Sequence, residues 1–237
     1  MSEWKAKRFW KKATVEAVVD GFQILLDGRP VRTPFKSPLV LPTRTMAEAM
    51  AAEWDVQTEN IDPRTMPITR SANSAIDKVV PQKRAVVEML AAYAQTDLLC
   101  HRAAYPPALS ARQAEGWDPV LSWAEKHFRA PLFVTVGIMP VEQPQTSLAA
   151  LQDAVDATPV FTLTGLHDLV MLSGSLVLGL AVRDRTIAAE TAWNLSRIDE
   201  DWQSAEWGHD DEAAAAADKK RDAFLHADRF VTLANGA

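Results

Sequence analysis

Cysteine is almost absent from this chain of 237 residues, since Cys100 is the only one. A single thiol excludes an internal disulfide framework and fits a protein kept in a reducing compartment. Basic residues are also outnumbered: the formal net charge is −6 and the isoelectric point is about 5.4. A chain this acidic is not expected to bind nucleic acid non-specifically.

The common signatures of catalytic, cofactor and metal sites are missing as well. Gly174 and Gly179 resemble part of a phosphate-binding loop, but alanine and valine stand where that loop needs lysine and serine or threonine. Cys100 and His101 are neighbours in sequence and point in different directions on a helix, so they do not form a nucleophile–base pair. The five histidines lack the spacing of metal ligands. We therefore expect no catalytic group, no cofactor and no metal.

Tryptophan, in contrast, is plentiful, with eight residues against two tyrosines. Most of them fall in predicted helices, where a large aromatic at helical spacing usually packs inward. One or two could instead serve as interface anchors. Met46, Met50 and Trp54 follow one another along a single helical face, so we assign Trp54 to the core.

The sequence predicts an α+β fold, with strands near the start and helices afterwards. The segments 13–19 and 22–26 are rich in aliphatic residues, with Asp20-Gly21 between them as a hairpin turn and Asp27-Gly28 as the next turn. Helix begins after Pro42, with Thr45 and Glu48 as a capping box. We place a small α/β domain at residues 1–80 and a predominantly helical domain at residues 81–237.

Two later segments need a specific interpretation. The run 163–182 approaches the length of a membrane span. Asp168 lies inside it, at a cost of about 2.5–3.5 kcal/mol on insertion scales, and Ser173-Gly174-Ser175 interrupts it. We therefore predict a buried helix, a break and a second helix in a protein core. The run 187–207 is predicted to form one long helix.

One helical face near the end of that helix combines unusual side chains. Glu200, Gln203 and Trp207 recur at positions i, i+3 and i+7, so a carboxylate, an amide and a large aromatic share one face. Such a face is typical of contact with another macromolecule. The alternative for Glu200 is an ion pair with Arg197 within the helix, worth only a few tenths of a kcal/mol.

Several stretches, in order along almost the whole chain, together resemble one family. They include Leu26-Asp27-Gly28-Arg29-Pro30, Thr33-Pro34, Glu53-Trp54-Asp55-Val56-Gln57, Met66-Pro67-Ile68-Thr69, Ala75-Ile76-Asp77, Thr96-Asp97-Leu98-Leu99-Cys100, Gln113, Trp117-Asp118-Pro119, Ser173-Gly174-Ser175 and Asp199-Glu200 with Gln203 and Trp207-Gly208. The chain is similar in these stretches to the ATP-twelve family, the chaperones that assemble the alpha subunit of the F(1) head of ATP synthase.

The resemblance implies a soluble assembly chaperone rather than an enzyme. Family members hold the unassembled alpha subunit, prevent its aggregation and release it to the beta subunit. By resemblance, the partner-binding residues are Asp199, Glu200, Gln203 and Trp207, with Glu200 foremost. Mitochondrial relatives carry an import presequence that is not seen here, so the resemblance implies a bacterial, cytoplasmic protein. We expect it to be monomeric and not to insert stably into membranes.

Two alternatives remain open at the level of sequence. One is a small-molecule enzyme with an inter-domain pocket, using Asp97, His101 or Glu200 as acid or base. The other concerns the basic and aromatic segment Trp4–Lys12, which could touch a membrane or an anionic partner. The simpler interpretation of that segment is a solvated arm leading into the first strand.

Overall fold

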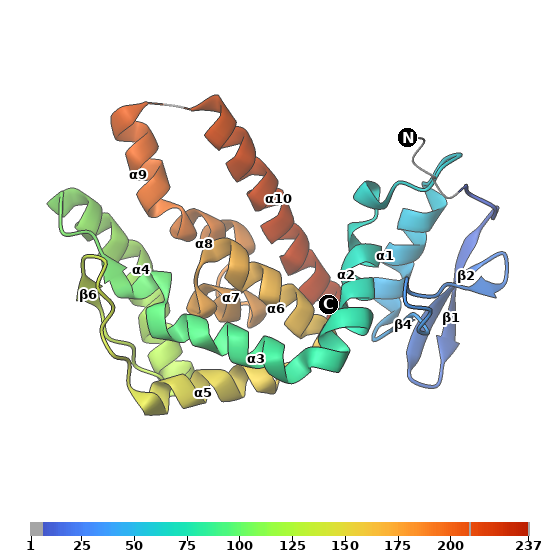
Figure 1. Cartoon of the computed structure of the whole chain (residues 1–237), viewed down its shortest axis with the longest axis horizontal. Coiled ribbons are helices and arrows are strands. Elements are labelled where there is room, and N and C mark those ends of the chain that lie inside the picture. Colours follow the sequence, from blue (N-terminus) through green and yellow to red (C-terminus); the bar gives the residue numbers. More distant parts are fainter. Residues whose placement is uncertain (1–6, 209, 237) are drawn as a thin grey trace. The chain divides into compact units, whose positions relative to one another are not determined.

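The structure is a computed structural model of the chain and describes residues 7–208 and 210–236. These residues fall into two compact units. Unit 1 comprises residues 7–83, 160–165 and 229–236, and unit 2 comprises residues 84–159 and the described part of 166–228. The α+β class is confirmed, with four of the six strands at the start and helices over most of the remainder (Figure 1). The division into domains at 1–80 and 81–237 stays a prediction.

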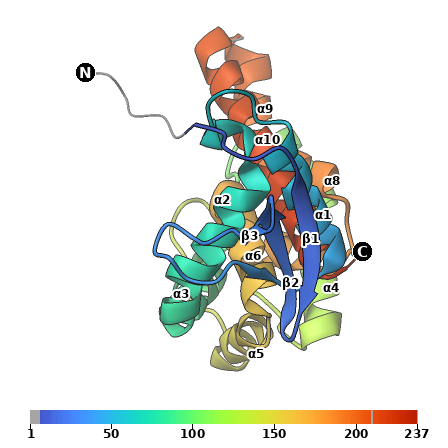
Figure 2. The same cartoon turned by 90° about the vertical axis from the view of Figure 1, so that its right-hand side faces the viewer.

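Unit 1 contains a small sheet, two α-helices and three short irregular helices. They are β1 (Ala13–Val18), β2 (Gly21–Leu26), β3 (Arg29–Pro30), β4 (Val40–Leu41), α1 (Arg44–Asp55), the 3₁₀ helix η1 (Pro63–Thr65), α2 (Pro67–Ser74), the π-helical segment η2 (Ala75–Val79) and the 3₁₀ helix η3 (Val80–Gln82). Helix α1 packs against the strands, as Figure 2 shows.

Strand β2 is the centre of this sheet. It pairs along its whole length with β1, and β3 and β4 pair with its two ends. The predicted first hairpin is confirmed, but its turn is Val19-Asp20, because Val18 pairs directly with Gly21. Gly21 belongs to the strand, where a Cβ would lie 2.2 Å from the carbonyl oxygen of Leu41. A glycine at this position therefore lets β4 approach, rather than forming the turn.

The second predicted turn is confirmed at Asp27-Gly28. Both residues have positive φ, 47° and 82°, as a two-residue hairpin turn with the right-handed twist of the strands requires. The carboxylate of Asp27 accepts hydrogen bonds from the amides of Lys11 and Lys12 at 2.9 and 3.0 Å. These two bonds lower the pKa of Asp27, and they fasten the preceding segment to the turn.

That preceding segment is part of unit 1 from Lys7 onward. Trp10 is buried in the core, and the guanidinium of Arg8 donates to the carbonyl oxygens of Trp10, Lys11, Asp55 and Gln57. The interpretation of this stretch as a solvated arm is therefore correct only in part: it leads into β1 and most of its side chains are exposed, but Arg8 and Trp10 fasten it to unit 1. Trp4, Lys5 and Ala6 lie outside the described residues.

Helix α1 begins two residues earlier than the capping box predicts. Its N-cap is Thr43, whose hydroxyl accepts from the amide of Met46 at 3.2 Å and donates to the carbonyl oxygen of Leu233 at 2.5 Å. The predicted cap Thr45 lies inside the helix. Thr43 is preferred because its backbone is extended, with φ −133° and ψ 153°, as an N-cap requires.

The end of α1 is joined to α2 by buried polar groups. Glu53, buried in this helix, accepts hydrogen bonds from the amides of Ile68 and Thr69 and from the Thr69 hydroxyl, at 2.7 to 2.9 Å. These are donors of the first turn of α2, which have no partner within that helix. Burial raises the pKa of Glu53, and the three donors act in the opposite direction.

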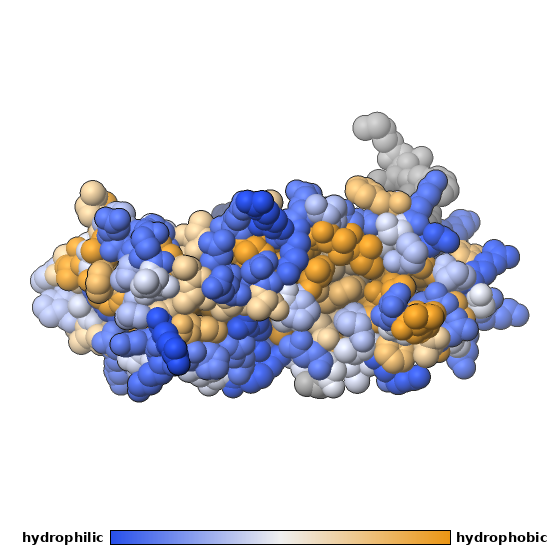
Figure 3. All heavy atoms as spheres, turned by 90° about the horizontal axis from the view of Figure 1, so that it is seen from below, coloured by the Kyte–Doolittle hydropathy of each residue, from blue (hydrophilic) through white to orange (hydrophobic). Residues whose placement is uncertain are grey.

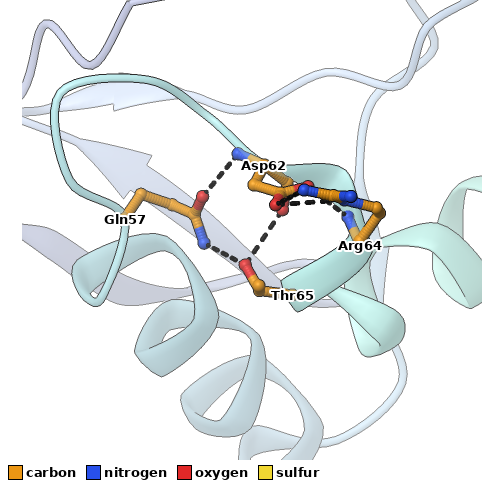
Figure 4. Close-up of polar contacts among 4 residues, drawn as sticks. All are labelled: Gln57, Asp62, Arg64 and Thr65. Carbon is orange, nitrogen blue, oxygen red and sulfur yellow. Dashed lines mark hydrogen bonds and ion pairs between the residues drawn. The ribbon is translucent and has the colours of Figure 1, made fainter.

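A second amide and hydroxyl network closes the connection between the two helices (Figure 4). Gln57, also buried, donates to the Thr65 hydroxyl at 3.0 Å and accepts from the amide of Asp62 at 2.8 Å. Thr65 donates in turn to the carbonyl oxygen of Asp62 at 2.9 Å. Arg64 forms an ion pair with the Asp62 carboxylate at 2.8 Å. The loop is therefore held in one conformation by its own side chains.

Unit 2 is helical apart from two short strands. Its elements are α3 (Lys83–Ala92), η4 (Tyr93–Thr96), η5 (Leu98–Cys100), β5 (His101–Arg102), α4 (Pro107–Phe128), β6 (Thr135–Val136), α5 (Gln145–Asp156), the later part of α6 (Val160–Ser173), α7 (Leu176–Arg183), α8 (Ala189–Ser196), α9 (Ile198–Trp207) and most of α10 (Asp211–Ala234).

The predicted interruption of the apolar run 163–182 is confirmed. Helix α6 ends at Gly174, which has a positive φ of 70°, and Ser175 caps α7 through the amide of Leu178. Most side chains of the two helices are buried. Among the described residues, no helix is long and apolar enough to cross a membrane.

A buried carboxylate fixes the start of α7. Asp97 is fully buried and accepts from the Ser175 hydroxyl at 2.7 Å and from the amides of Val177 and Leu99 at 3.1 Å. It therefore connects η5 to a helix that begins about 80 residues later. Burial raises the pKa of Asp97, and these donors partly oppose that rise.

Replacing Trp54 by arginine is expected to destabilise unit 1. Its ring packs edge-on against buried Trp10 at 5.2 Å between centroids and contacts the core of the unit. An arginine there would bring an unpaired charge against apolar side chains, and we expect a loss of several kcal/mol. Val56→Arg, at a position that is 69% exposed, should change the stability by less than about 0.5 kcal/mol. Equal melting temperatures for both variants would contradict the core assignment.

Replacing Asp97 by asparagine is expected to change how stability depends on pH. Because burial raises the pKa of Asp97 above 3.8 in the folded state, the folded chain holds this proton to higher pH than the unfolded chain. Asp97 therefore lowers the stability as pH rises from the pKa of the unfolded chain to the higher pKa of the folded chain. Urea unfolding measures the free energy of unfolding at each pH. Between about pH 4 and about pH 7, this free energy should fall less, or rise more, for Asp97→Asn than for wild type.

Exposed Asp153 supplies the control for this measurement. Asp153→Asn should keep the wild-type pH profile. A profile for Asp97→Asn that runs parallel to wild type over the whole interval would refute the inferred linkage.

Candidate functional site

Helix α9 carries the face that the sequence singles out. The predicted helix 187–207 is wrong as a single element, because it is broken at Arg197 into α8 and α9. Arg197 leaves helical geometry with φ −105° and ψ 5°, and the Ser196 hydroxyl donates to the carbonyl oxygen of Trp193 at 2.7 Å. Asp199, Glu200 and Asp201 then occupy the first turn of α9, where negative charge is favoured by the helix dipole.

The start of α9 is anchored to α4. Buried Gln113 of α4 donates to the Asp199 carboxylate at 2.6 Å and accepts from the amide of Ala103 at 2.7 Å. Gly116 allows close approach, since a Cβ there would lie 2.8 Å from the side chain of Leu195 and 3.0 Å from that of Ile198. Asp199, predicted to bind a partner, thus has a contact within the chain that orients α9.

The other three predicted residues line a hollow bounded by α8, α9 and the start of α10. We call it the α9–α10 hollow. Its volume is about 690 Å³, and its lining comprises Trp193, Asn194, Arg197, Glu200, Asp201, Gln203, Ser204, Trp207, Gly208, Asp210, Ala213, Ala214, Ala217 and Asp218. The structure therefore brings Glu200, Gln203 and Trp207 together on one wall, as their spacing predicts.

The ion pair considered from sequence is formed. Arg197 donates to the Glu200 carboxylate at 3.0 Å, and its guanidinium also lies 5.8 Å from the centre of the Trp193 ring. Because the Glu200 side chain is about half exposed, such a pair contributes little to stability. The pair leaves the Glu200 carboxylate in contact with solvent.

The hollow is acidic at its rim. Asp210 caps α10 through the amides of Glu212 and Ala213, at 2.9 and 3.1 Å. Asp201 and Asp218 form no ion pair among residues 7–208 and 210–236. Among the described residues of the lining, Arg197 is the one basic side chain, against four acidic ones. A basic group on a partner would therefore be attracted to this rim.

The apolar part of the lining comes from two tryptophans and three alanines. Trp193 is buried beneath the hollow, and three alanines of α10 contribute small side chains. Trp207 at the end of α9 is 83% exposed, which is unusual for a residue of this size. Within the described part of the chain, no cluster of histidine, cysteine, aspartate and glutamate could hold a metal ion.

A second hollow lies on the other side of α9 and escaped the sequence analysis. It has a volume of about 490 Å³ and is lined by Tyr105, Pro106, Leu109, Trp202, Gln203, Glu206 and Trp207. Gln203 and Trp207 line both hollows. Helix α9 therefore presents aromatic side chains in two directions, which the spacing of Trp202 and Trp207 could have indicated.

Exposed apolar side chains also gather in the segment that contains β6. Phe133, Val134, Val136, Ile138 and Met139 are all substantially exposed, with Ile138 at 91%. The sequence could not identify this feature, because buried and exposed apolar residues look alike in one sequence. On the face drawn in Figure 3, apolar residues reach the surface in several patches among hydrophilic ones.

The residues of the enzyme hypothesis are not joined by any contact that the structure describes. Asp97 is enclosed and bonded to the start of α7. The His101 ring contacts the carbonyl oxygen of Gly137 at 3.3 Å, and Glu200 pairs with Arg197. Cys100 is buried, and burial raises the pKa of its thiol to about 12, which disfavours a reactive thiolate.

Comparison with known proteins identifies relatives over nearly the whole chain. The sequence pattern of the ATP12 chaperone protein family matches residues 7–125. The structure of Atp12 from Paracoccus denitrificans is 51% identical, with a TM-score of 0.95 over 98% of this chain and 100% of that one. A mutant of Paracoccus denitrificans Atp12p, with aspartate replaced by lysine, has a TM-score of 0.96 at the same identity and coverage.

Two more distant proteins extend the comparison. The Atu1473 protein of Agrobacterium tumefaciens is 41% identical, with a TM-score of 0.88 over 97% of this chain and 86% of that one. Mitochondrial protein atp12 of Schizosaccharomyces pombe is 22% identical over 215 residues, which cover 85% of this chain and 74% of that protein.

Replacing Gln113 by alanine is expected to loosen α9. The change would leave the Asp199 carboxylate and the Ala103 amide without their partner, and we expect a loss of about 1–3 kcal/mol. Relative to wild type, hydrogen exchange in Gln113→Ala should become faster for the amides of α9 and stay unchanged for those of α7. The control Gln145→Ala removes an exposed glutamine from the first turn of α5. Unchanged protection of α9 in Gln113→Ala would show that the anchor is unimportant.

Proposed function

Since the chain belongs to the ATP12 chaperone protein family, we propose that it is an assembly chaperone of ATP synthase. Its client is the unassembled F(1) alpha subunit, which it binds, protects from aggregation and releases to the beta subunit. The observation that carries this proposal is the α9–α10 hollow, where an acidic rim and an exposed tryptophan stand beside each other.

The proposal has a simple physical basis. An isolated subunit of a ring exposes a large apolar interface, and such surfaces drive aggregation. A chaperone that covers part of this interface blocks wrong associations. The beta subunit then displaces the chaperone because it buries more complementary surface.

Glu200, Gln203 and Trp207 are the proposed client-binding residues. The half-exposed carboxylate of Glu200 can form a charge-assisted hydrogen bond with a basic or amide group of the client. Trp207 offers a large apolar surface at the same wall of the hollow. Asp199 takes part through its bond with Gln113, which sets the orientation of α9.

Reversing the charge of Glu200 is expected to abolish client capture without unfolding the chain. Glu200→Lys places a cation beside Arg197 and removes the acceptor proposed for the client. Light scattering of freshly diluted F(1) alpha subunit should be suppressed by wild type and not by this variant. The melting temperature should stay within a few degrees of wild type, because an exposed ion pair contributes at most about 1 kcal/mol.

Glu190 supplies a matched control for this experiment. It is a half-exposed glutamate of α8 that pairs with Arg221 at 2.5 Å and does not line the hollow. Glu190→Lys should suppress aggregation as wild type does. Suppression by a folded Glu200→Lys would remove this residue from the proposed site, and a lack of suppression by wild type would refute the proposed client.

A further inference from the structure

The loop between β3 and β4 presents an aromatic side chain that nothing in the described structure covers. Figure 2 shows this segment extending away from the paired strands. Phe35 is 73% exposed, and both residues beside it are exposed too. Thr33 at one end of the same loop is 4% exposed. The loop is therefore buried at Thr33 and exposed at Phe35. We call residues 33–37 the Phe35 loop.

Hydrogen bonds close this loop into one conformation. The amide of Thr33 donates to the carbonyl oxygen of Ser37 at 3.1 Å, and the amide of Lys36 donates to that of Thr33 at 2.8 Å. The guanidinium of Arg32 donates to the carbonyl oxygen of Lys36 at 3.0 Å. Lys36 has a positive φ of 66°, a conformation that L-residues rarely adopt and that the surrounding bonds must enforce.

A carboxylate from a distant segment holds the tip. Asp77 of η2 accepts from the Thr33 hydroxyl at 2.7 Å and from the amide of Phe35 at 3.1 Å. The amide of Ser37 donates to the same hydroxyl at 3.1 Å. Two of the stretches that resemble the chaperone family, Thr33-Pro34 and Ile76-Asp77, therefore meet here. Their contact positions Phe35, which among the described residues forms no aromatic ring pair and does not belong to the hydrophobic core of unit 1.

The surroundings of Phe35 are basic. Lys36 on the loop and Arg32 next to it are exposed, as is Arg29 in the preceding strand β3, whereas Asp77 is bound to the loop itself. Within the described residues, unit 1 carries 13 basic and 9 acidic side chains, for a net charge of +4. Unit 2 carries 11 basic and 21 acidic side chains, for a net charge of −10. The Phe35 loop is thus a positively charged surface in an acidic protein.

We propose that the Phe35 loop is a second client-binding element, which inserts Phe35 into an apolar pocket with an acidic rim on the folded client. The choice of the alpha subunit as that client rests on the proposed function. An exposed aromatic held in place before binding loses little conformational freedom on binding. Rigid aromatic anchors of this kind often dominate the energy of an interface, and the flanking cations would be attracted to an acidic rim.

The geometry favours a protein pocket over a lipid surface. Membrane binding grows with the buried apolar area and with attraction to anionic lipids, and it does not need a fixed loop conformation. Here one aromatic side chain is presented, and six hydrogen bonds fix the loop that carries it. Such bracing is useful when the partner has a defined shape.

The test is the affinity of each variant for purified F(1) alpha subunit, measured by biolayer interferometry with the full chain. We expect Phe35→Ser to weaken binding by about 30-fold, as loss of an aromatic anchor does. Val19→Ser, at a fully exposed apolar position of the β1–β2 turn, is the matched control and should bind as wild type does. Replacing Arg29 and Lys36 together by glutamate should weaken binding and remove part of its salt dependence.

A double-mutant cycle tests the role of Asp77 as a positioning residue. Asp77→Ala should weaken binding less than Phe35→Ser does, because the loop loses the carboxylate that holds it but keeps the Phe35 side chain. Combining Asp77→Ala with Phe35→Ser should then weaken binding no further than Phe35→Ser alone. Additive losses would show that Asp77 acts on binding independently of Phe35, which would overturn this part of the proposal.

The outcomes separate this inference from the proposed function. Wild-type affinity for Phe35→Ser, with affinity lost in Glu200→Lys, would overturn the loop proposal and leave the function intact. An absence of binding by wild type would overturn both. If Phe35→Ser instead lost only its binding to vesicles with 30% anionic lipid, the loop would be a membrane contact and the proposal would be wrong.

Discussion

Each unit depends on a buried carboxylate that accepts hydrogen bonds from the first turn of a helix in another segment. Glu53 does this for α2, and Asp97 does it for α7. The helix start supplies several donors that need an acceptor, and the carboxylate needs donors to offset its loss of hydration. Neither group can be buried without the other, so the two segments must come together. Burial still raises the pKa of both carboxyl groups, which shows that desolvation is the larger effect.

The same principle extends from the cores to the two surfaces where we place the client. Gln113 joins α4 to the first turn of α9 through Asp199, and Asp77 joins η2 to the Phe35 loop. In both cases a polar side chain from another segment holds the backbone of the element that carries an exposed aromatic. The aromatics, Trp207 and Phe35, are themselves 83% and 73% exposed. Rigid support under an exposed aromatic is the arrangement that a binding surface requires.

Local rules explain which parts of this structure the sequence could predict. The turn at Asp27-Gly28 and the helix break at Gly174 need residues that tolerate positive φ, and such residues are visible in sequence. The face formed by Glu200, Gln203 and Trp207 follows from helical spacing alone. The partners of Asp97 and Gln113 lie 78 and 86 positions away, and no local pattern encodes them. The misplaced cap at Thr45 has a related feature, because Thr43, the N-cap with the extended backbone, also bonds to Leu233, 190 positions away.

The two proposed surfaces carry opposite charge and would therefore bind oppositely charged regions of a client. Trp207 stands at an acidic rim, whereas Phe35 stands among cations in a unit of opposite net charge. A client that used both would need a basic region and an acidic region at matching positions, which few unrelated proteins offer. Charge matching of this kind contributes more to specificity and to the rate of association than to affinity. It therefore suits the function proposed above, in which the chain selects one subunit quickly and later releases it to a partner with a larger apolar interface.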